Sequence, residues 1–251
     1  MAYEFTDTSG PNIETPDPLR TIWGGSVLDE VIPGFRTLNV TGRELMSPQL
    51  SMTARVGGDG VWVDHARLPE RYIYVEALVL NYNEAALELN AKLHKGLQEL
   101  AFTDAPGWLF QAFYHGYKAP KNDRRQQVIT LTFVCPDPYA RSAAQVSTGT
   151  LAGEPGYPVA LESIVAVPEA AGASLRITCG QHNLYITGPI AAGAVYKVSW
   201  LGSPILTENG QPAANRLELA SDYEGFSVKA GDTITSTPAA ALTITYRERR
   251  L

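Results

Sequence analysis

The clearest hydrophobic pattern in the chain lies between residues 71 and 80, where apolar positions alternate with others. The apolar set is Ile73, Val75, Ala77 and Val79, and the alternating set is Tyr72, Tyr74 and Glu76. Side chains of a β-strand point to opposite faces in turn, and β-branched and aromatic residues are enriched in strands. The pattern therefore predicts a strand over Arg71–Leu80 with one buried face.

Beyond this strand the apolar spacing lengthens to that of a helix. The residues of the new stripe are Ala86, Leu89, Leu93, Leu97 and Leu100. Apolar residues three or four positions apart form one face of an α-helix. With Asn83 as its N-cap, the stripe predicts a helix over Asn83–Leu100, the only long helix expected.

A long β-hairpin is predicted next, from Trp108–Tyr117 and Gln127–Cys135 around a polar, net-positive tip at 118–125. Pro136 and Pro138 end its second strand, because proline cannot donate to a ladder. Shorter strands are expected earlier, at 38–41 and 50–56, before a glycine-rich turn at 57–60. Strand, helix and hairpin together predict an α+β N-terminal domain.

Residues 142–158 are small, polar and rich in turn formers, which favours a linker. The segments that follow alternate as short strands bounded by turn residues, at 159–167, 174–179, 183–187, 194–200, 205–208, 216–219, 225–229, 232–236 and 241–247. This pattern predicts an antiparallel β-sandwich. The fold class is therefore mostly β, with domains at 1–141 and 142–251, and the last strand, about 241–251, can return to the N-terminal domain.

Composition adds limits rather than a function. The chain has 251 residues, 45% hydrophobic and 18% charged, with net charge −6; an acidic balance argues against a nucleic-acid-binding protein. Two cysteines make no disulfide framework, although a single bridge stays open. We expect no signal peptide and no membrane span, and therefore a soluble protein made in the cytoplasm.

Catalytic and metal-binding motifs are not evident, so neither an enzyme nor a cofactor is expected. The four histidines, His65, His94, His115 and His182, lack metal-ligand spacing. A hydrolase reading could use His65 beside Asp64, or His182 near Cys179, but neighbours on a strand face opposite ways. A glycosidase pair among Glu208, Glu218, Asp222 and Glu224 cannot be tested by spacing, and the modest number of acidic residues in this half favours an ordinary acidic surface.

Aromatic residues of the C-terminal half leave a binding alternative open. Tyr196 and Trp200 share a predicted strand and could stack on sugar rings, although inward aromatics also fill sandwich cores. This supports, as the alternative function, a carbohydrate-binding host-adhesion protein acting through the C-terminal sandwich.

The order of these segments resembles the distal tail protein family of long-tailed bacteriophages and prophages. The resemblance is carried by the strand from Arg71 with the helix behind it, by Ala101–Leu109, and by the hairpin that ends in Ile129–Ala140 with its Asp-Pro-Tyr turn. Ser221–Ile234 and Leu242–Tyr246 resemble the family's last strands.

The resemblance implies a structural protein of the virion, at the phage tail tip. It implies a homohexameric ring of N-terminal domains between the tail tube protein and the tail-tip proteins, with a channel through which DNA passes without specific binding. It also implies a galectin-like C-terminal sandwich that can dock receptor-binding proteins. A tail-associated hydrolase is a third reading.

Exposed hairpins with unpaired edges can join sheets between subunits. The candidate assembly contacts are therefore the residues of the long hairpin, Trp108, Phe110, Tyr114, Lys118, Lys121, Arg124 and Arg125. The basic tip could meet an acidic neighbour, or it could be a solvated turn.

Overall fold

The computed structural model describes residues 18–119, 126–153, 157–201, 203 and 205–251. Strands dominate these residues, so the predicted mostly β class is confirmed. Unit 1 of the chain contains Met1–Arg43, Glu70–Pro106 and Gln111–Pro136, and unit 2 contains Glu44–Pro69, Gly107–Phe110 and Asp137–Leu251. Among the described residues, no helix is long and apolar enough to span a membrane.

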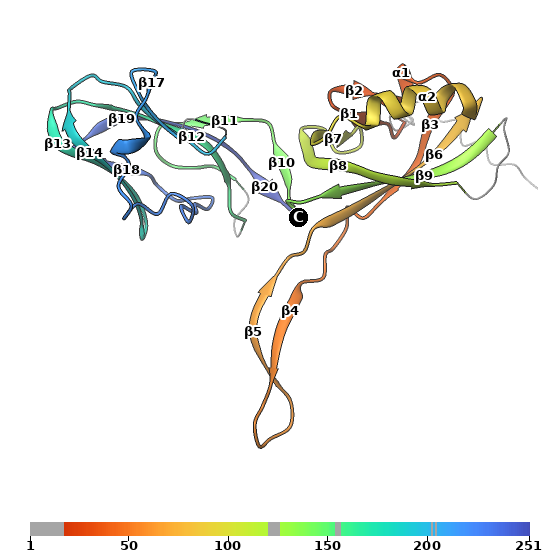
Figure 1. The fold of residues 1–251 in the computed structure, drawn as a ribbon, viewed down its shortest axis with the longest axis horizontal. Helices are drawn as coiled ribbons and strands as arrows, with labels where there is room; N and C mark the ends of the chain where they lie inside the picture. Colours follow the sequence, from red (N-terminus) through yellow and green to blue (C-terminus); the bar gives the residue numbers. More distant parts are fainter. Residues whose placement is uncertain (1–17, 120–125, 154–156, 202, 204) are drawn as a thin grey trace, which may run out of the picture. The chain divides into compact units, whose positions relative to one another are not determined.

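Unit 1 is built on a sheet with the strand order β2-β1-β7-β8-β9-β6-β3 (Figure 1). The strands are β1 Thr21–Trp23, β2 Ser26–Val27, β3 Phe35–Thr41, β6 Arg71–Leu80, β7 Gln98–Phe102, β8 Trp108–Lys118 and β9 Gln126–Cys135. The helices are α1 Leu28–Val31 and α2 Tyr82–Leu93. The first residues of β8 are grouped with unit 2.

The strand β6 spans the residues that the alternation predicted, and its apolar positions are fully buried. It pairs antiparallel with β9, so that Val75 lies opposite Leu131 and Ala77 opposite Ile129. The helix α2 covers this buried face with Ala85, Leu89 and Leu93. The other face of the same strands carries the alternating residues and is exposed.

The helix α2 is shorter than predicted, because it ends at Leu93. Leu97 lies beyond it and is 44% exposed, whereas Leu100 is buried in β7. Gly96, at φ +76°, marks the end of the helix, and the apolar spacing continues past it. The predicted N-cap was also wrong: Asn81, in the left-handed region at φ 53°, occupies that position without a side-chain cap.

Asp29 on α1 joins β1 to β3 through hydrogen bonds. Its carboxylate accepts hydrogen bonds from the Thr21 amide at 3.1 Å, the Thr37 amide at 2.7 Å and the Thr37 hydroxyl at 2.8 Å.

Asp29→Ala should lower the free energy of unfolding by about 2 kcal/mol, because two strand amides lose a charged acceptor. Urea titration of Glu30→Ala is the control, since this exposed neighbour should cost less than about 1 kcal/mol; equal losses would contradict the role of Asp29.

Unit 2 contains two sheets of a sandwich and a separate two-stranded hairpin. The sheets have the orders β11-β19-β12-β15-β16-β17 and β14-β13-β18, and the hairpin is β4-β5. The strands are β4 Gln49–Ala54, β5 Val61–Arg67, β10 Ala140–Ser142, β11 Gln145–Ser147, β12 Ala160–Pro168, β13 Gly172–Cys179, β14 His182–Ile190, β15 Tyr196–Ser199, β16 Leu206–Glu208, β17 Gln211–Pro212, β18 Thr235–Thr237, β19 Ala240–Arg247 and β20 Arg249–Arg250.

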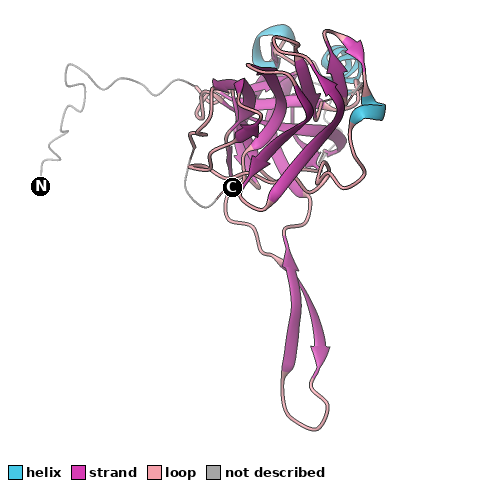
Figure 2. Cartoon of the chain, turned by 90° about the vertical axis from the view of Figure 1, so that its left-hand side faces the viewer, coloured by secondary structure: helices cyan, strands magenta, loops and turns pink. Residues whose placement is uncertain are grey.

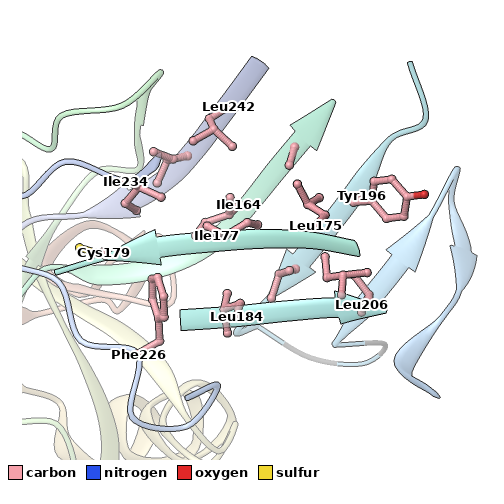
Figure 3. Packing of buried hydrophobic residues seen from close by; sticks show 14 of the residues in the cluster. Ile164, Leu175, Ile177, Cys179, Leu184, Tyr196, Leu206, Phe226, Ile234 and Leu242 are labelled. Carbon is pink, nitrogen blue, oxygen red and sulfur yellow. The ribbon is translucent and has the colours of Figure 1, made fainter. Parts of the chain in front are cut away.

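Both sheets of the sandwich contribute side chains to one hydrophobic core (Figure 3). Ile164 comes from β12 of the larger sheet, and Ile177 and Leu184 come from β13 and β14 of the smaller one. Each of these three side chains is fully buried. Removal of this apolar surface from water is the main force that holds the sheets together.

The segment predicted as a linker is packed in unit 2 instead. Its β11 pairs with β19, and Leu151 is buried while its amide donates to the carbonyl of Asp232 at 3.0 Å. Two predicted strands are wrong. In 216–219, Arg216 ends a short 3-10 helix, Ala214–Arg216, and Leu217 makes only an isolated bridge with Ile186; 225–229 makes only an isolated bridge at Lys229.

The chain ends beside the Asp-Pro-Tyr turn. The strand β20 pairs with β10, and β10 pairs with the start of β8 through Ser142 and Trp108. The Asp137 carboxylate accepts hydrogen bonds from Arg141 at 2.6 Å and from Arg249 at 3.0 Å. The Asp-Pro-Tyr turn, which carried the family resemblance, therefore binds the last strand through a charged hydrogen bond.

Candidate assembly surfaces

The hairpin β4-β5 is a two-stranded ribbon that the sequence did not reveal as one element (Figure 2). Its tip is glycine-rich, and Gly57 and Gly60 both have positive φ, at +80° and +92°. The Arg55 amide donates to the Gly60 carbonyl at 3.3 Å and closes the turn. Glycine adopts such angles at little steric cost, which explains the residue type at these positions.

One face of this ribbon is entirely apolar. In the register of the two strands, Leu50 lies opposite Ala66, Met52 opposite Val63 and Ala54 opposite Val61. We call these six residues the hairpin apolar face. Every residue of both strands except Ser51 is exposed, and Met52 and Val63 are each 55% exposed. An isolated hairpin is marginally stable in water, so this face is a candidate interaction surface.

The opposite face of the ribbon, which we call the polar face because it carries Ser51 and Thr53, also carries Trp62, which is 60% exposed. The Thr53 hydroxyl donates to Asp64 at 2.6 Å, and the Arg55 guanidinium lies 4.3 Å from the ring centre of Trp62. The two faces therefore differ in chemistry: one is entirely apolar, and the other combines polar side chains with one exposed aromatic ring. The sequence does contain a signal for this hairpin, because apolar and polar residues alternate on both sides of the glycine-rich turn. That alternation was interpreted only as separate short strands.

The face of the unit 1 sheet opposite α2 is also uncovered among the described residues. Its central residues are Tyr72 and Tyr74 of β6, Thr132 and Val134 of β9, and Phe113 and Gly116 of β8, which we call the open sheet face. Tyr72, Tyr74 and Phe113 are 37%, 41% and 40% exposed. Aromatic residues are enriched at protein interfaces, so this surface is a second candidate.

The predicted assembly residues fall in different surroundings. Phe110 is buried, and Trp108 is half-buried with the Arg250 guanidinium 4.1 Å from its ring centre. Tyr114 faces α2, where its ring lies 5.2 Å from that of His94. Lys118 is exposed. Lys121, Arg124 and Arg125 lie outside the described residues, so their role stays a prediction.

A small cavity separates α2 from the strands β8 and β9. Its volume is about 160 Å³. It is lined by Tyr82, Ala86, Leu89, Asn90, Leu93, Tyr114, Tyr117, Ile129 and Leu131. Burial, with a hydrogen bond to Tyr117, raises the pKa of Tyr82 to about 12. The Tyr82 phenol therefore stays neutral at physiological pH.

The two residues proposed for sugar stacking are packed inside unit 2. Tyr196 is fully buried, and its hydroxyl donates to Glu208 at 2.8 Å. Trp200 is half-buried, stacks on Tyr223 at 5.5 Å and donates its indole N–H to the Tyr223 carbonyl. Core packing, the other interpretation of these aromatics, is what the structure shows for Tyr196.

The ionisable residues considered for catalysis lie on different elements of unit 2, and three of them, Glu218, Asp222 and Glu224, line one open pocket. Asp64 and His65 are exposed on the hairpin, and the nearest nitrogen of His182 is 3.8 Å from Asp222 at a solvent-accessible site. In the described part of the chain, no group of three or more His, Cys, Asp or Glu residues could hold a metal ion.

The two cysteines are free and buried, so the bridge left open by the sequence is absent. Cys135 ends β9 of unit 1, and Cys179 ends β13 of unit 2. Burial, with the nearby Asp232 carboxylate, raises the pKa of Cys179 to about 11. A thiol with so high a pKa is a poor nucleophile at neutral pH.

Comparison with known proteins finds likeness in structure rather than in sequence. No family model and no curated protein matches the chain. The crystal structure of the SPP1 Dit protein (gp 19.1), described as a paradigm of the hub adsorption apparatus in phages that infect Gram-positive bacteria, matches with a TM-score of 0.76 and 20% identity. That match covers 93% of this chain and 99% of SPP1 Dit.

Two structures of the phage p2 baseplate in its activated conformation, with Sr and with Ca, match more weakly. Both have a TM-score of 0.52 and 8% identity, and cover 93% and 92% of this chain and 98% of theirs. The fold is therefore Dit-like along nearly the whole chain, as the order of the sequence segments predicted.

Proposed function

We propose that this chain is a structural, non-enzymatic protein of a bacteriophage tail tip. Six copies form a ring that joins the tail tube to the tip proteins and leaves a channel for DNA. The observation that carries the proposal is the fold: a Dit hub protein matches it from end to end, with 99% of that protein covered. A fold shared over whole chains supports a shared architectural role, although fold alone does not determine function.

The exposed apolar surfaces support assembly. The hairpin apolar face cannot be covered by its own two strands, and large exposed apolar patches commonly mark interaction sites. Each subunit therefore carries an element that is completed only by a partner. The net charge of −6 also suits a channel, because a basic lumen would bind the phosphates of passing DNA.

Unit 2 supplies a platform in this proposal. Its two packed sheets form a galectin-like sandwich that can dock a receptor-binding protein at the tail tip of the virion. The structure gives no particular support to the carbohydrate-binding alternative, because Tyr196 is buried and Trp200 is stacked against Tyr223.

The test is the mass and shape of the purified full chain. Native mass spectrometry and light scattering should give six times the subunit mass of 27.2 kDa, and negative-stain images should show rings with a central hole. A strict monomer across a wide concentration range would refute the ring. A stable assembly of another number would refute the stoichiometry alone.

The hairpin should matter to this assembly through one face only. Met52→Asp should weaken each subunit contact by about 3 kcal/mol, roughly a hundredfold, because a charge would be desolvated without a partner. Ser51→Asp is the matched control, since Ser51 lies on the polar face beside it. Light scattering over a dilution series should show monomers for the first variant and rings for the second; equal behaviour would exclude the apolar face.

A further inference from the structure

We propose that the hairpin apolar face of one copy packs on the open sheet face of the next copy. The inference rests on the proposed ring and names the two surfaces that build it. Both surfaces are sheet faces with exposed apolar side chains, and neither is covered in the described part of the chain. Sheets pack face to face through interdigitated side chains, so each surface is a suitable partner for the other.

The open sheet face has no side chain at Gly116 of β8. Gly116 lies opposite Thr132, and Thr132 lies opposite Tyr74. A Cβ atom added at Gly116 would meet nothing within 4 Å, so the space above this glycine is open. Tyr74 and Phe113 are exposed on the same face. A long, unbranched side chain such as that of Met52 fits a gap of this kind.

The chemistry of the two surfaces is complementary. The hairpin offers aliphatic side chains and one thioether, whereas the open sheet face offers aromatic rings. Methionine sulfur makes favourable contacts with aromatic rings and adapts to irregular gaps. The next row of the sheet, with Glu76, Thr130 and Lys118, is polar and limits the apolar area on that side. An apolar centre with a polar boundary is the usual anatomy of an interface.

The dimensions also agree. The six residues of β4 extend over about 20 Å, and two paired strands are about 5 Å apart. The strands β6, β9 and β8 are adjacent and span about 10 Å between the outer two, so a two-stranded ribbon can lie over them. The hairpin is therefore neither too wide nor too short for this surface.

We assign the open sheet face to the hairpin of a second copy because both surfaces are exposed in the single chain, and the two surfaces are different. A contact between unlike patches is heterologous, and repeating it closes into a ring when the rotation allows. Each copy then gives its hairpin to one neighbour and receives a hairpin from the other. The area that a single hairpin can bury is smaller than the roughly 800 Å² per partner of a typical interface. In a closed ring each copy makes this contact twice, once with its own hairpin and once with the hairpin of its neighbour.

Cysteine cross-linking tests the pairing directly. One full-length variant carries Met52→Cys and another carries Tyr74→Cys, and the two are mixed under mild oxidation. The native thiols are buried and do not compete. A disulfide-linked dimer should form at least about tenfold faster than in two control mixtures, because bound surfaces hold the thiols at high effective concentration.

The control mixtures change one side at a time. Thr53→Cys with Tyr74→Cys uses the polar face of the hairpin, and Met52→Cys with Leu87→Cys uses the exposed side of α2. Similar rates in all mixtures would overturn the pairing. A chain with both Met52→Cys and Tyr74→Cys that cross-links only within itself would also overturn it, because the occupant would then be the same copy.

The outcomes separate this inference from the ring itself. Rings of six without the Met52–Tyr74 cross-link would retain the proposed function and reject this interface. Cross-linked dimers from a protein that never forms rings would support the interface and reject the hexamer. Tyr74→Phe is the control for folding, because it keeps the aromatic side chain. Its assembly constant should stay within about threefold of that of the parent chain.

Discussion

Replacing Phe133 with alanine should lower the free energy of unfolding by about 3–5 kcal/mol. Phe133 is fully buried at the centre of unit 1. Its ring lies 4.9 Å from that of Trp23 and 6.0 Å from that of Tyr114. Truncation removes apolar contacts from three elements at once, and the tightly paired strands around it cannot collapse into the cavity.

Urea denaturation followed by tryptophan fluorescence is the measurement, because Trp23 reports on the same contact. Phe133→Leu should lower the free energy of unfolding much less, by about 1 kcal/mol, since most of the side-chain volume is kept. Val134→Ala is the control for strand position, because Val134 lies next in sequence on the open sheet face. If Phe133→Ala costs no more than Val134→Ala, the core of unit 1 is not centred on this ring.

Replacing Arg216 with methionine should be the most costly change in the charged network of unit 2, about 3 kcal/mol. The guanidinium donates to the Thr187 carbonyl at 2.8 Å and to the Pro189 carbonyl at 2.9 Å. It also forms an ion pair with Glu208. Without it, two carbonyl oxygens and a carboxylate lose a donor between β14 and β16, which belong to different sheets.

The same network predicts a pH dependence. Hydrogen bonds from Arg216 and then from Tyr196 lower the pKa of Glu208. A carboxylate with a lowered pKa in the folded protein stabilises the fold above its unfolded pKa, about 4.3, and loses this contribution as the pH falls through the folded value. The stability difference between the parent chain and Glu208→Gln should therefore shrink from pH 7 to pH 3. Thermal unfolding at a series of pH values measures it, and a constant difference would contradict the assignment.

The sequence predicted best those strands in which one face is buried and the other is exposed. In β6 the alternation placed both ends of the strand, because one face is sealed under α2 and the other is not. The helix was overextended since Leu97 and Leu100 continue the helical spacing by chance beyond Gly96. Spacing alone cannot distinguish a continuing helix from a turn followed by a strand.

The assembly surfaces were harder to predict, for a physical reason. The hairpin β4-β5 has strand-like alternation, but pairing and exposure depend on partners that are distant in sequence or lie on another chain. The aromatic residues left two interpretations open, because Tyr196 has the same sequence signature whether it faces a core or a ligand. Burial separates these cases, and burial is a property of the fold.

The distribution of the two thiols gives the protein one chemical reporter in each unit. Cys135 belongs to unit 1 and Cys179 to unit 2, and both are inaccessible in the folded chain. A thiol-reactive dye can label each only after its surroundings open, so labelling rates resolved by peptide mapping measure the opening of each half separately. The natural sequence can thus reveal whether the halves melt together or one at a time, without any introduced cysteine.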